Sequence, residues 1–246
     1  MIGLVAALPA EVYCFAGRLP PGGTAPLGEC GWLQLSGMGR ANARRAAVAL
    51  ADAGATALMS WGCAGGLDPT LKAGALLLPA KIRAADARVF LVSVAWHKQL
   101  RDQLSWQLEA HVGDLLEASH PLTSAAKKNT LFCATGAAAV DMESAAVAEV
   151  AAERGLEFAA LRVVLDPAAR ALPASALAAI DAAGRLQVGK LLRSLVQRPR
   201  DLYELLQLRS DLRMAQTILA TAARLTALGA PVDKAADKTA NKATAR

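Results

Sequence analysis

The sequence is poor in aromatic residues, which make up only 4% of its 246 residues. Hydrophobic residues nevertheless account for 54% of the chain and charged residues for 20%. The chain can therefore bury a substantial core, but Ala, Leu and Val must build it. This length suits one large α/β domain or a domain with an appendage.

Cysteine and histidine are scarce, and neither shows a ligand pattern. The four cysteines are Cys14, Cys30, Cys63 and Cys133. They form no CxxC pair and no spacing typical of a disulfide framework, so we expect free thiols, as in a reducing cytosol. The three histidines form no HExxH motif and have no cysteine at ligand spacing, so no metal site is predicted.

Long apolar runs and export signals are also missing. No run approaches about 18 apolar residues, so no transmembrane helix is predicted. The apolar N-terminus lacks a basic region before it, and Pro9 and Glu11 interrupt it, which argues against a signal peptide. We therefore expect a cytoplasmic protein.

The net charge of +6 is unevenly distributed. Part of the excess lies in the last segment, DKAADKTANKATAR, which is polar and has no apolar periodicity. The chain has no RNP motif, no zinc-finger spacing and no patch of interleaved basic and aromatic residues. No nucleic-acid partner is predicted.

Short apolar segments alternate with helix-like segments over the first 166 residues. The predicted strands are 2–8, 31–37, 55–61, 74–82, 87–93, 114–119 and 158–166. The predicted helices are 40–54, 96–111, 123–136 and 141–155, and loops are expected at 19–28 and 62–69. This alternation predicts a three-layer α/β/α fold with a central mixed sheet.

The C-terminal part differs in kind. Residues 184–228 carry Leu at helical spacing with Arg and Lys between, broken at Pro199, and residues 229–246 are typical of a disordered basic tail. We therefore divide the chain into a catalytic domain (1–183), a helical extension (184–228) and a tail (229–246). The extension either packs on the core or presents a basic amphipathic surface to a membrane or a lipid-like substrate.

Three carboxylates fall where predicted strands end. Glu11 follows the first strand, Asp166 ends the last one, and Glu143 stands near the start of the helix VDMESAAVAEV. Each alone could be a helix cap or a solvated charge. Ligands of open α/β sheets bind beyond the carboxyl ends of strands, so together the three carboxylates indicate a cleft.

The segment SGMGRAN (36–42) runs from strand through GxG into helix. As a dinucleotide motif it is weak, because Asn42 stands where a small residue is needed and no acidic residue occurs near 57–60. It also lacks the GK[ST] ending of a phosphate-binding P-loop. Its glycines more simply allow the backbone to approach a sugar or phosphate closely.

Four segments together carry a family resemblance. They are IGLVAALPAEV, LSGMGRANA, SWGCAGGLDPTLKAG, and AVDMESAAVA followed by LRVVLDPA. The chain resembles the purine nucleoside phosphorylase superfamily over roughly residues 1–170, and within it the methylthioadenosine/adenosylhomocysteine nucleosidases. VDMES, the D-P pair, the short middle region and the Leu/Arg-rich extension are most similar to the hopanoid-associated phosphorylase branch, which cleaves adenosylhopane.

The resemblance implies a nucleoside phosphorylase-like fold and a role for each carboxylate. N-glycosidic cleavage of a purine nucleoside passes through a ribosyl cation-like state. Asp166 would protonate N7 of the base, which requires a raised pKa. Glu143 would bind the ribose hydroxyls, with Met142 packed against the sugar, and Glu11 would activate water. Asp141 is expected to be a helix cap.

The resemblance also implies further binding residues and no cofactor. The nucleoside would be held by Glu143, Met142, Cys63, Ala64, Gly65, Gly39, Pro121 and Leu122. In phosphorolysis, phosphate would be the co-substrate, held by Arg40 and the GCAGG backbone. We favour hydrolysis, because a carboxylate at Glu11 would repel phosphate.

Departures from the family pattern concern the substrate. Leu165 and Cys63 replace hydroxyl residues, and no stacking aromatic occurs in HPLTS, where Pro121 and Leu122 are expected to line the base pocket. The short middle region would leave one end of the cleft open to a bulky 5′ group, as in a lipid-linked nucleoside. We expect a homodimer by resemblance, with contact between the C-terminal helices and the inner membrane as an open option.

Alternatives remain at this stage. They are a phosphate-dependent purine nucleoside phosphorylase, a methylthioadenosine/adenosylhomocysteine nucleosidase, a nucleoside-binding module without catalysis, and a membrane-surface scaffold built on the C-terminal helices. The substitutions at Leu165 and Cys63 support the binding module, whereas the presence of all three carboxylates argues against it.

Overall fold

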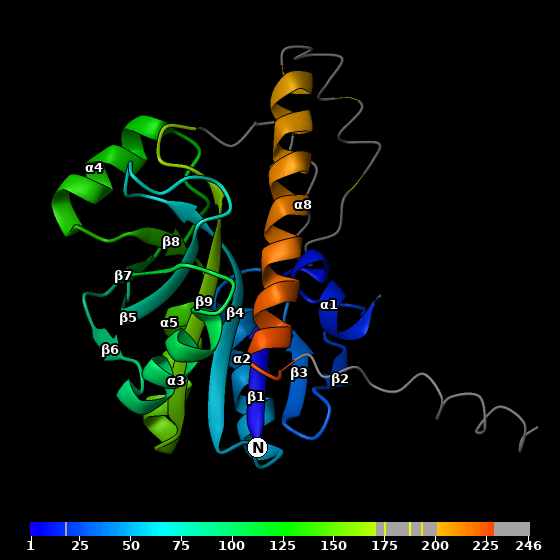
Figure 1. The fold of residues 1–246 in the computed structure, drawn as a ribbon. Coiled ribbons are helices and arrows are strands. Elements are labelled where there is room, and N and C mark those ends of the chain that lie inside the picture. Colours follow the sequence, from blue (N-terminus) through cyan, green and yellow to red (C-terminus); the bar gives the residue numbers. More distant parts are fainter. Residues whose placement is uncertain (18, 171–174, 176–186, 188–192, 194–200, 229–246) are drawn as a thin grey trace, which may run out of the picture.

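A mixed β-sheet forms the centre of the protein in the computed structural model, which describes residues 1–17, 19–170, 175, 187, 193 and 201–228 (Figure 1). Within these residues the sheet has nine strands. They are β1 (Ile2–Ala6), β2 (Thr24–Pro26), β3 (Gly31–Leu35), β4 (Ala57–Gly66), β5 (Leu76–Arg83), β6 (Val89–Leu91), β7 (Ala110–Glu117), β8 (Ala139–Asp141) and β9 (Glu157–Asp166).

Strand direction brings several strand ends to one edge of the sheet. The order is β2-β3-β1-β4-β8-β7-β5-β6, and β9 pairs with β4 and β5. Strands β3, β1, β4 and β9 run parallel, so their carboxyl ends meet. Strand β8 runs antiparallel to the last residues of β4, pairing Val140 with Gly65. Strand β8 therefore runs back along the last residues of β4, which extend past the end of β1.

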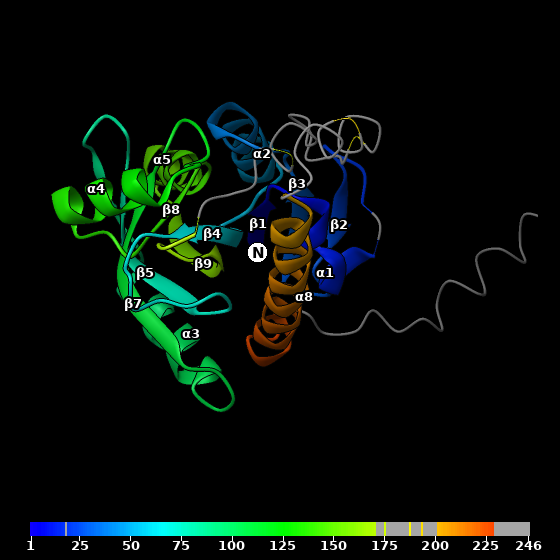
Figure 2. The same cartoon turned by 90° about the horizontal axis from the view of Figure 1, so that it is seen from above.

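Helices cover both faces of the sheet, which confirms the predicted three-layer α/β/α architecture (Figure 2). Helices α2 (Arg40–Asp52) and α5 (Ser144–Arg154) lie on one face. Helices α3 (Val94–Leu104) and α8 (Asp201–Leu225) lie on the other, together with the short α1 (Tyr13–Ala16) and the 3₁₀ turn η1 (Pro9–Glu11). Helix α4 (Ala125–Thr135) packs beside β7 and β8.

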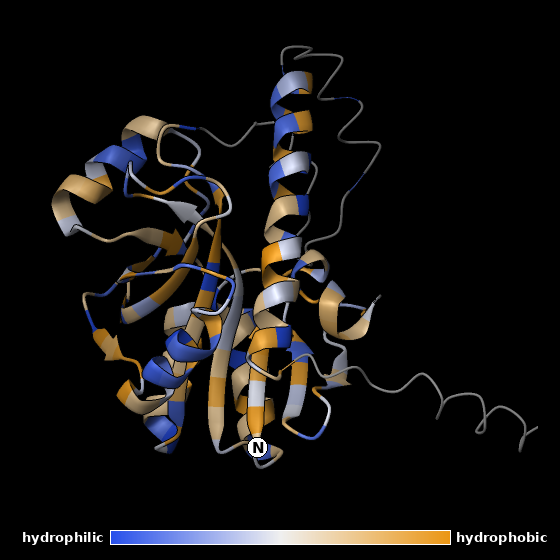
Figure 3. Cartoon of the chain, viewed as in Figure 1, coloured by the Kyte–Doolittle hydropathy of each residue, from blue (hydrophilic) through white to orange (hydrophobic). Residues whose placement is uncertain are grey.

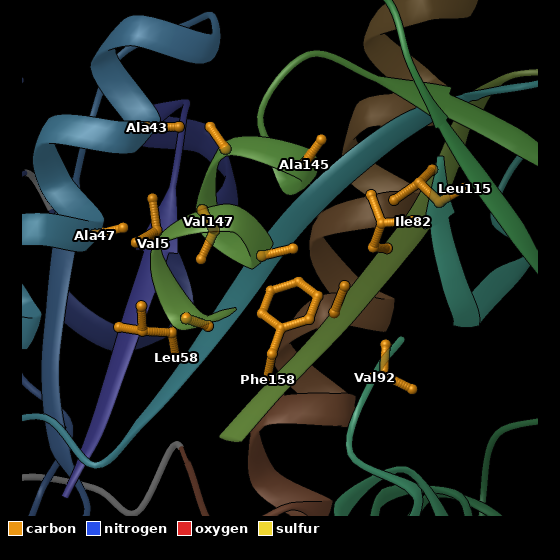
Figure 4. Packing of buried hydrophobic residues seen from close by; sticks show 14 of the residues in the cluster. Val5, Ala43, Ala47, Leu58, Ile82, Val92, Leu115, Ala145, Val147 and Phe158 are labelled. Carbon is orange, nitrogen blue, oxygen red and sulfur yellow. The ribbon is translucent and has the colours of Figure 1, made fainter. Parts of the chain in front are cut away.

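Small side chains build the first face of the core. Ala43 and Ala47 of α2 face the same cluster as Ala145 of α5, which also holds Val5 and Phe158 of the sheet (Figure 4). Alanine lets helix and strand backbones approach closely and costs little side-chain entropy on burial. With few aromatic residues, this part of the core is instead filled by helices with small side chains that pack close to the sheet.

Sequence patterns located most elements, and tertiary pairing corrected several boundaries. Residues 62–66, predicted as loop, continue β4 because β9 pairs along them and β8 joins at Gly65 and Gly66. Residues 139–141, predicted to lead into or open a helix, form β8 between β4 and β7. The predicted helix 96–111 ends at Leu104, and the predicted loop 19–28 contains β2.

Helix ends follow local chemistry more closely. The Ser124 side chain accepts a hydrogen bond from the Lys127 N–H, and α4 ends at Gly136 with φ +65°. Gly155 ends α5 with φ +63°. These are the predicted serine cap and glycine stops, and they depend only on neighbouring residues.

Helix α8 packs on the core, as one of the two predicted alternatives has it. Ala215, Leu219, Ala222 and Ala223 are buried in a cluster with strand residues such as Leu161. Hydrophilic and hydrophobic residues are mixed along α8 (Figure 3). In the described part of the chain no helix has the length and hydropathy to cross a bilayer. The domain boundary at 183/184, the helix predicted before Pro199 and the tail 229–246 lie outside the described residues.

Two leucines of α8 test this packing. Leu219 is 1% exposed and Leu206 is 56% exposed. We expect Leu219→Ala to lower the free energy of unfolding by about 2–4 kcal/mol, because it removes buried methyl groups and leaves a cavity. Leu206→Ala on the same helix should change it by less than about 0.5 kcal/mol. Urea unfolding measures both, and equal losses would contradict the packing described.

Candidate active site

A cleft opens where β1, β4, β8 and β9 end, beside the loop between β7 and α4. Its floor and walls are mostly apolar, with carboxylates placed among them, as in small-molecule sites generally. The lining residues are Ala7, Leu8, Glu11, Met38, Cys63, Ala64, Gly65, Ala118, His120, Pro121, Leu122, Lys128, Val140, Asp141, Met142, Glu143, Leu165 and Asp166. Glu11, Glu143 and Asp166, widely separated in sequence, share this one cleft.

Glu11 is fixed by backbone N–H groups. Its Oε2 accepts hydrogen bonds from the Ala7 N (3.0 Å) and the Leu8 N (2.8 Å), and its Oε1 accepts one from the Cys63 N (2.8 Å). The side chain is 4% exposed, and this burial raises its pKa, while nearby Arg162 and the three N–H donors oppose the rise. The result is a rigid, partly desolvated carboxyl group suited to accept a proton.

Gly62 makes room for Glu11. Its φ is +146°, and a Cβ atom there would lie 2.4 Å from the Glu11 Oε1. Only glycine suits both the backbone conformation and the close approach. The first glycine of the GCAGG segment thus leaves the space that the Glu11 carboxylate occupies.

Glu143 stands between β8 and α5 and reaches across to the start of α2. Its Oε1 accepts a 2.6 Å hydrogen bond from the Gly39 N. Burial, and next the negative charge of Asp141, raise the pKa of Glu143 to about 7. Gly39 lies outside the cleft lining, but its N–H holds this carboxylate in place.

Asp141 is more than the predicted helix cap. Its Oδ2 accepts from the Ser144 N (3.2 Å), as a capping carboxylate does, although the residue ends β8 and α5 begins only at Ser144. The same oxygen forms a buried ion pair with Arg162, 2.8 Å from Nη2. Asp141 and Glu143 make different contacts, in agreement with the prediction that they serve different purposes.

Arg162 lies beneath the cleft and was missed in the sequence analysis. It is 2% exposed, and its guanidinium also donates to the Ser60 Oγ (2.6 Å) and the Ser144 Oγ (2.9 Å). Its positive charge acts on Asp141, Glu11 and Glu143. A charged residue in the middle of the apolar segment FAALRVVLD was the available signal, since such a residue is buried only when paired.

Asp166 ends β9 and pairs with Lys128 of α4. The Lys128 Nζ lies 2.5 Å from the Asp166 Oδ2, and both side chains are almost fully buried. Burial raises the pKa of Asp166, and the ammonium of Lys128 opposes that rise. Nothing in the sequence distinguished Lys128 from its exposed neighbour Lys127, because the partner comes from a strand 38 residues away.

Much of the cleft lining is apolar. Pro121 and Leu122 lie in the cleft lining, together with Ala118, His120 and Leu165. No Phe, Tyr or Trp belongs to the lining formed by the described residues. The lining also includes the ring of His120, which the sequence analysis did not select.

Arg40, the expected phosphate ligand, lies outside the cleft lining. Its Nη1 is 2.6 Å from the Glu117 Oε1, and its Nη2 is 2.6 Å from the Glu149 Oε2. Both halves of the guanidinium are thus engaged by carboxylates. Among the residues that the structure describes, no cluster of three or more His, Cys, Asp or Glu could hold a metal ion.

Comparisons with known proteins agree with this architecture. Residues 23–197 match the family model described as the Phosphorylase superfamily. That range includes Glu143 and Asp166 and begins after Glu11. No curated protein matches the chain by sequence.

Three solved structures share the fold. One is a 5′-methylthioadenosine/S-adenosylhomocysteine nucleosidase from Neisseria meningitidis, in complex with methylthio-immucillin-A. Its sequence is 16% identical to this one and the TM-score is 0.68; the alignment covers 93% of this chain and 99% of the nucleosidase chain. A mutant of the Helicobacter pylori enzyme named MTAN, with 5′-methylthioadenosine in its active site, is 18% identical, with a TM-score of 0.63. That alignment covers 91% of this chain and 97% of the MTAN chain. Futalosine hydrolase from Helicobacter pylori is 20% identical, with a TM-score of 0.58, and the alignment covers 67% of this chain and 87% of the hydrolase chain.

The raised pKa of Glu143 gives a test of the site's electrostatics. Between the ordinary value of 4.5 and about 7, the folded protein binds a proton that the unfolded chain releases, so stability falls as pH rises through this range. The amide of Glu143→Gln cannot ionise, so this variant does not lose stability through the ionisation of residue 143. We expect the variant to be more stable than the wild type by about 1–3 kcal/mol at pH 8, with a smaller difference at pH 4.5.

Glu153→Gln, near the C-terminal end of the helix that follows Glu143, is the matched control for this measurement. Glu153 is exposed, and its hydrogen bond to Arg44 lowers its pKa. This variant should gain no stability at pH 8. Urea unfolding at both pH values decides, and a Glu143→Gln protein with the same pH dependence as the wild type would disprove the assignment.

Proposed function

The chain belongs to the phosphorylase superfamily, and from this premise we propose that it cleaves the N-glycosidic bond of an adenosyl nucleoside by hydrolysis, releasing adenine. One observation carries the proposal: Glu11, Glu143 and Asp166 come from three separate parts of the chain and line a single, largely apolar cleft. Burial raises the pKa of all three carboxyl groups. Such shifts are typical of acid–base sites.

Asp166 is the proposed acid. As the C1′–N9 bond breaks, its electron pair moves into the purine, and the Asp166 proton passes to N7, so the base leaves neutral. Burial favours the protonated carboxyl group that this step requires. Gly65 lies against this carboxyl group, since a Cβ at that position would be in van der Waals contact with both carboxyl oxygens, at 3.4 Å.

Glu143 and Glu11 act on the sugar. The Glu143 carboxylate accepts hydrogen bonds from the ribose hydroxyls, and its negative charge stabilises the cation-like ribosyl group. Glu11 takes a proton from the water that adds to C1′. The sum is nucleoside plus water giving adenine plus the free sugar. To complete the cycle, Glu11 releases the proton it took from water, and Asp166 takes up a proton from solvent.

Hydrolysis is favoured over phosphorolysis on two grounds. The carboxylate of Glu11 lines the cleft and would repel phosphate, while Arg40 is engaged by Glu117 and Glu149. The solved proteins of similar fold are named nucleosidases and a hydrolase. Phosphorolysis is the second candidate, supported by the name of the superfamily itself.

Release of adenine with and without phosphate tests this function. We expect the wild type to release adenine from an adenosyl nucleoside in phosphate-free buffer. Asp166→Asn should lower kcat by about 10²–10⁴-fold, because the acid is lost. Asp86→Asn, at an exposed position paired with Arg88, is the control and should leave kcat unchanged.

The outcome separates the remaining candidates. Release that depends on phosphate would make the protein a phosphorylase. Absence of release from any purine nucleoside, with retained binding, would favour a nucleoside-binding module. HPLC of the free base distinguishes these results.

The proposed substrate carries a hydrocarbon at C5′, as adenosylhopane does, which would place the reaction in hopanoid side-chain synthesis. Support comes from the VDMES and D-P motifs and from the apolar lining at Leu8, Met38 and Leu165. The extension also reaches this part of the molecule, since the Gln216 Nε2 of α8 donates to the Ala10 O, next to Glu11. A homodimer and contact of the C-terminal helices with the inner membrane belong to the same proposal.

Substrate preference tests the 5′ group. We expect kcat/KM for an adenosine with a long 5′ hydrocarbon to exceed that for methylthioadenosine by about tenfold or more, because each buried CH₂ contributes about 0.8 kcal/mol. A short-chain 5′-alkyl adenosine is the control and should fall between the two. Equal or better turnover of methylthioadenosine would assign the chain to that nucleosidase activity instead.

A further inference from the structure

Lys128 is buried in the cleft wall and lacks a role in the reaction proposed above. Its side chain is 0% exposed. A lysine is rarely buried so completely unless its charge is paired and its N–H groups are satisfied. Here four oxygens surround the ammonium, and one of them belongs to the proposed acid.

Three of these oxygens are main-chain carbonyls. The Lys128 Nζ donates to the carbonyls of Asp166, Pro167 and Arg170, each at 3.0 Å. These residues form a turn closed by the hydrogen bond from the Arg170 N to the Pro167 O. The Arg170 side chain in turn pairs with Asp211 of α8. The turn is therefore held from α4 on one side and from α8 on the other.

The fourth oxygen is the Asp166 Oδ2, 2.5 Å from the Lys128 Nζ. No described side chain donates a hydrogen bond to Oδ1. A proton on this carboxyl group avoids the oxygen that faces an ammonium and is carried by the other one. The three main-chain carbonyls hold the ammonium of Lys128 in place, and the ammonium in turn orients the carboxyl group of Asp166.

We propose that Lys128 is a positioning residue for the cleavage reaction: its ammonium, seated in the three carbonyls, holds Oδ2 of Asp166 and leaves Oδ1 as the oxygen that carries and delivers the proton. This inference rests on the proposed function, in which Asp166 protonates the leaving base. Lys128 also sets the charge of Asp166, because an ammonium at this distance opposes the effect of burial.

Other charged and titratable groups near Asp166 enter the pH dependence. In the described residues they are Arg170 beyond β9, Cys63 on β4, the buried Arg162 on β9, and Glu11, Asp141, Glu143 and His120 in the cleft lining. Among the described side chains, Lys128 donates a hydrogen bond to the Asp166 carboxyl group, and none of these groups does. Of the charged groups around it, Lys128 is expected to have the largest effect on the pKa of Asp166.

The test compares Lys128→Met with Lys127→Met. Lys127 is the exposed neighbour on α4, so it receives the same substitution without loss of the buried contact. We expect Lys128→Met to lower kcat for adenine release by about 10–100-fold, since a misplaced acid is inefficient, with KM changed by less than about threefold. The alkaline limb of its kcat profile should move up by about 1–3 pH units, because the opposing charge is gone.

Two further variants separate positioning from folding. Lys128→Arg keeps the charge and should return the alkaline limb toward the wild-type position. Lys128→Gln keeps hydrogen-bond donors for the carbonyls but not the charge, and it replaces Lys128→Met if that protein does not fold. An unmoved alkaline limb in folded, uncharged variants, or an unchanged kcat, would overturn the proposal.

A measurement without turnover keeps this test independent of the proposed function. The ¹³C NMR titration of the Asp166 carboxyl carbon, assigned with Asp166→Asn, should show its midpoint raised by about 1–3 pH units in Lys128→Met. A wild type that releases no base from any purine nucleoside would refute the function, whereas an unchanged midpoint would refute the role of Lys128.

Discussion

The buried guanidinium of Arg162 is the interaction on which the site depends. Asp141 pairs with it directly, the Ser60 and Ser144 hydroxyls accept hydrogen bonds from Nη2, and the Leu161 carbonyl accepts one from Nη1. Its charge also offsets the proximity of Glu11 and Glu143, which would otherwise be costly to bury as carboxylates. Without this cation, several acidic groups could not share one apolar cleft.

Strand β9 links this cation to the proposed acid. Arg162 and Asp166 are four residues apart on the same strand, and the pairing of β9 with β4 shifts register just before Asp166. Pairing with β4 and β5 fixes β9 on both sides, and Lys128 fixes the turn that follows. The acid thus sits on a rigid strand end, whereas Glu11 is held by backbone N–H groups of the segment after β1.

Two buried cations divide the electrostatics of the cleft. Arg162 lies under the side where Glu11 and Glu143 would face the sugar, and Lys128 lies beside Asp166, where the base would leave. Arg162 opposes the effect of burial on the pKa of Glu11 and Glu143, whereas Lys128 opposes it on the pKa of Asp166. A reaction that needs an acid and a base together requires such a separation.

Local sequence determined much of the fold. Alternating apolar segments predicted the three-layer architecture, and Ser124, Gly136 and Gly155 marked helix ends, because caps and stops depend on neighbouring residues. The positions of Glu11, Glu143 and Asp166 after predicted strands, together with the family motifs, selected the residues that the structure brings into one cleft.

Only the tertiary structure showed what surrounds those residues. Residues 62–66 and 139–141 became strands because distant segments pair with them, and such pairing leaves no local pattern. Lys128 and Arg40 look like ordinary surface cations in the sequence, yet one is buried against Asp166 and the other is held by Glu117 and Glu149. The sequence named the carboxylates, whereas the protonation of each depends on desolvation and on a cation from another element, which only folding brings together.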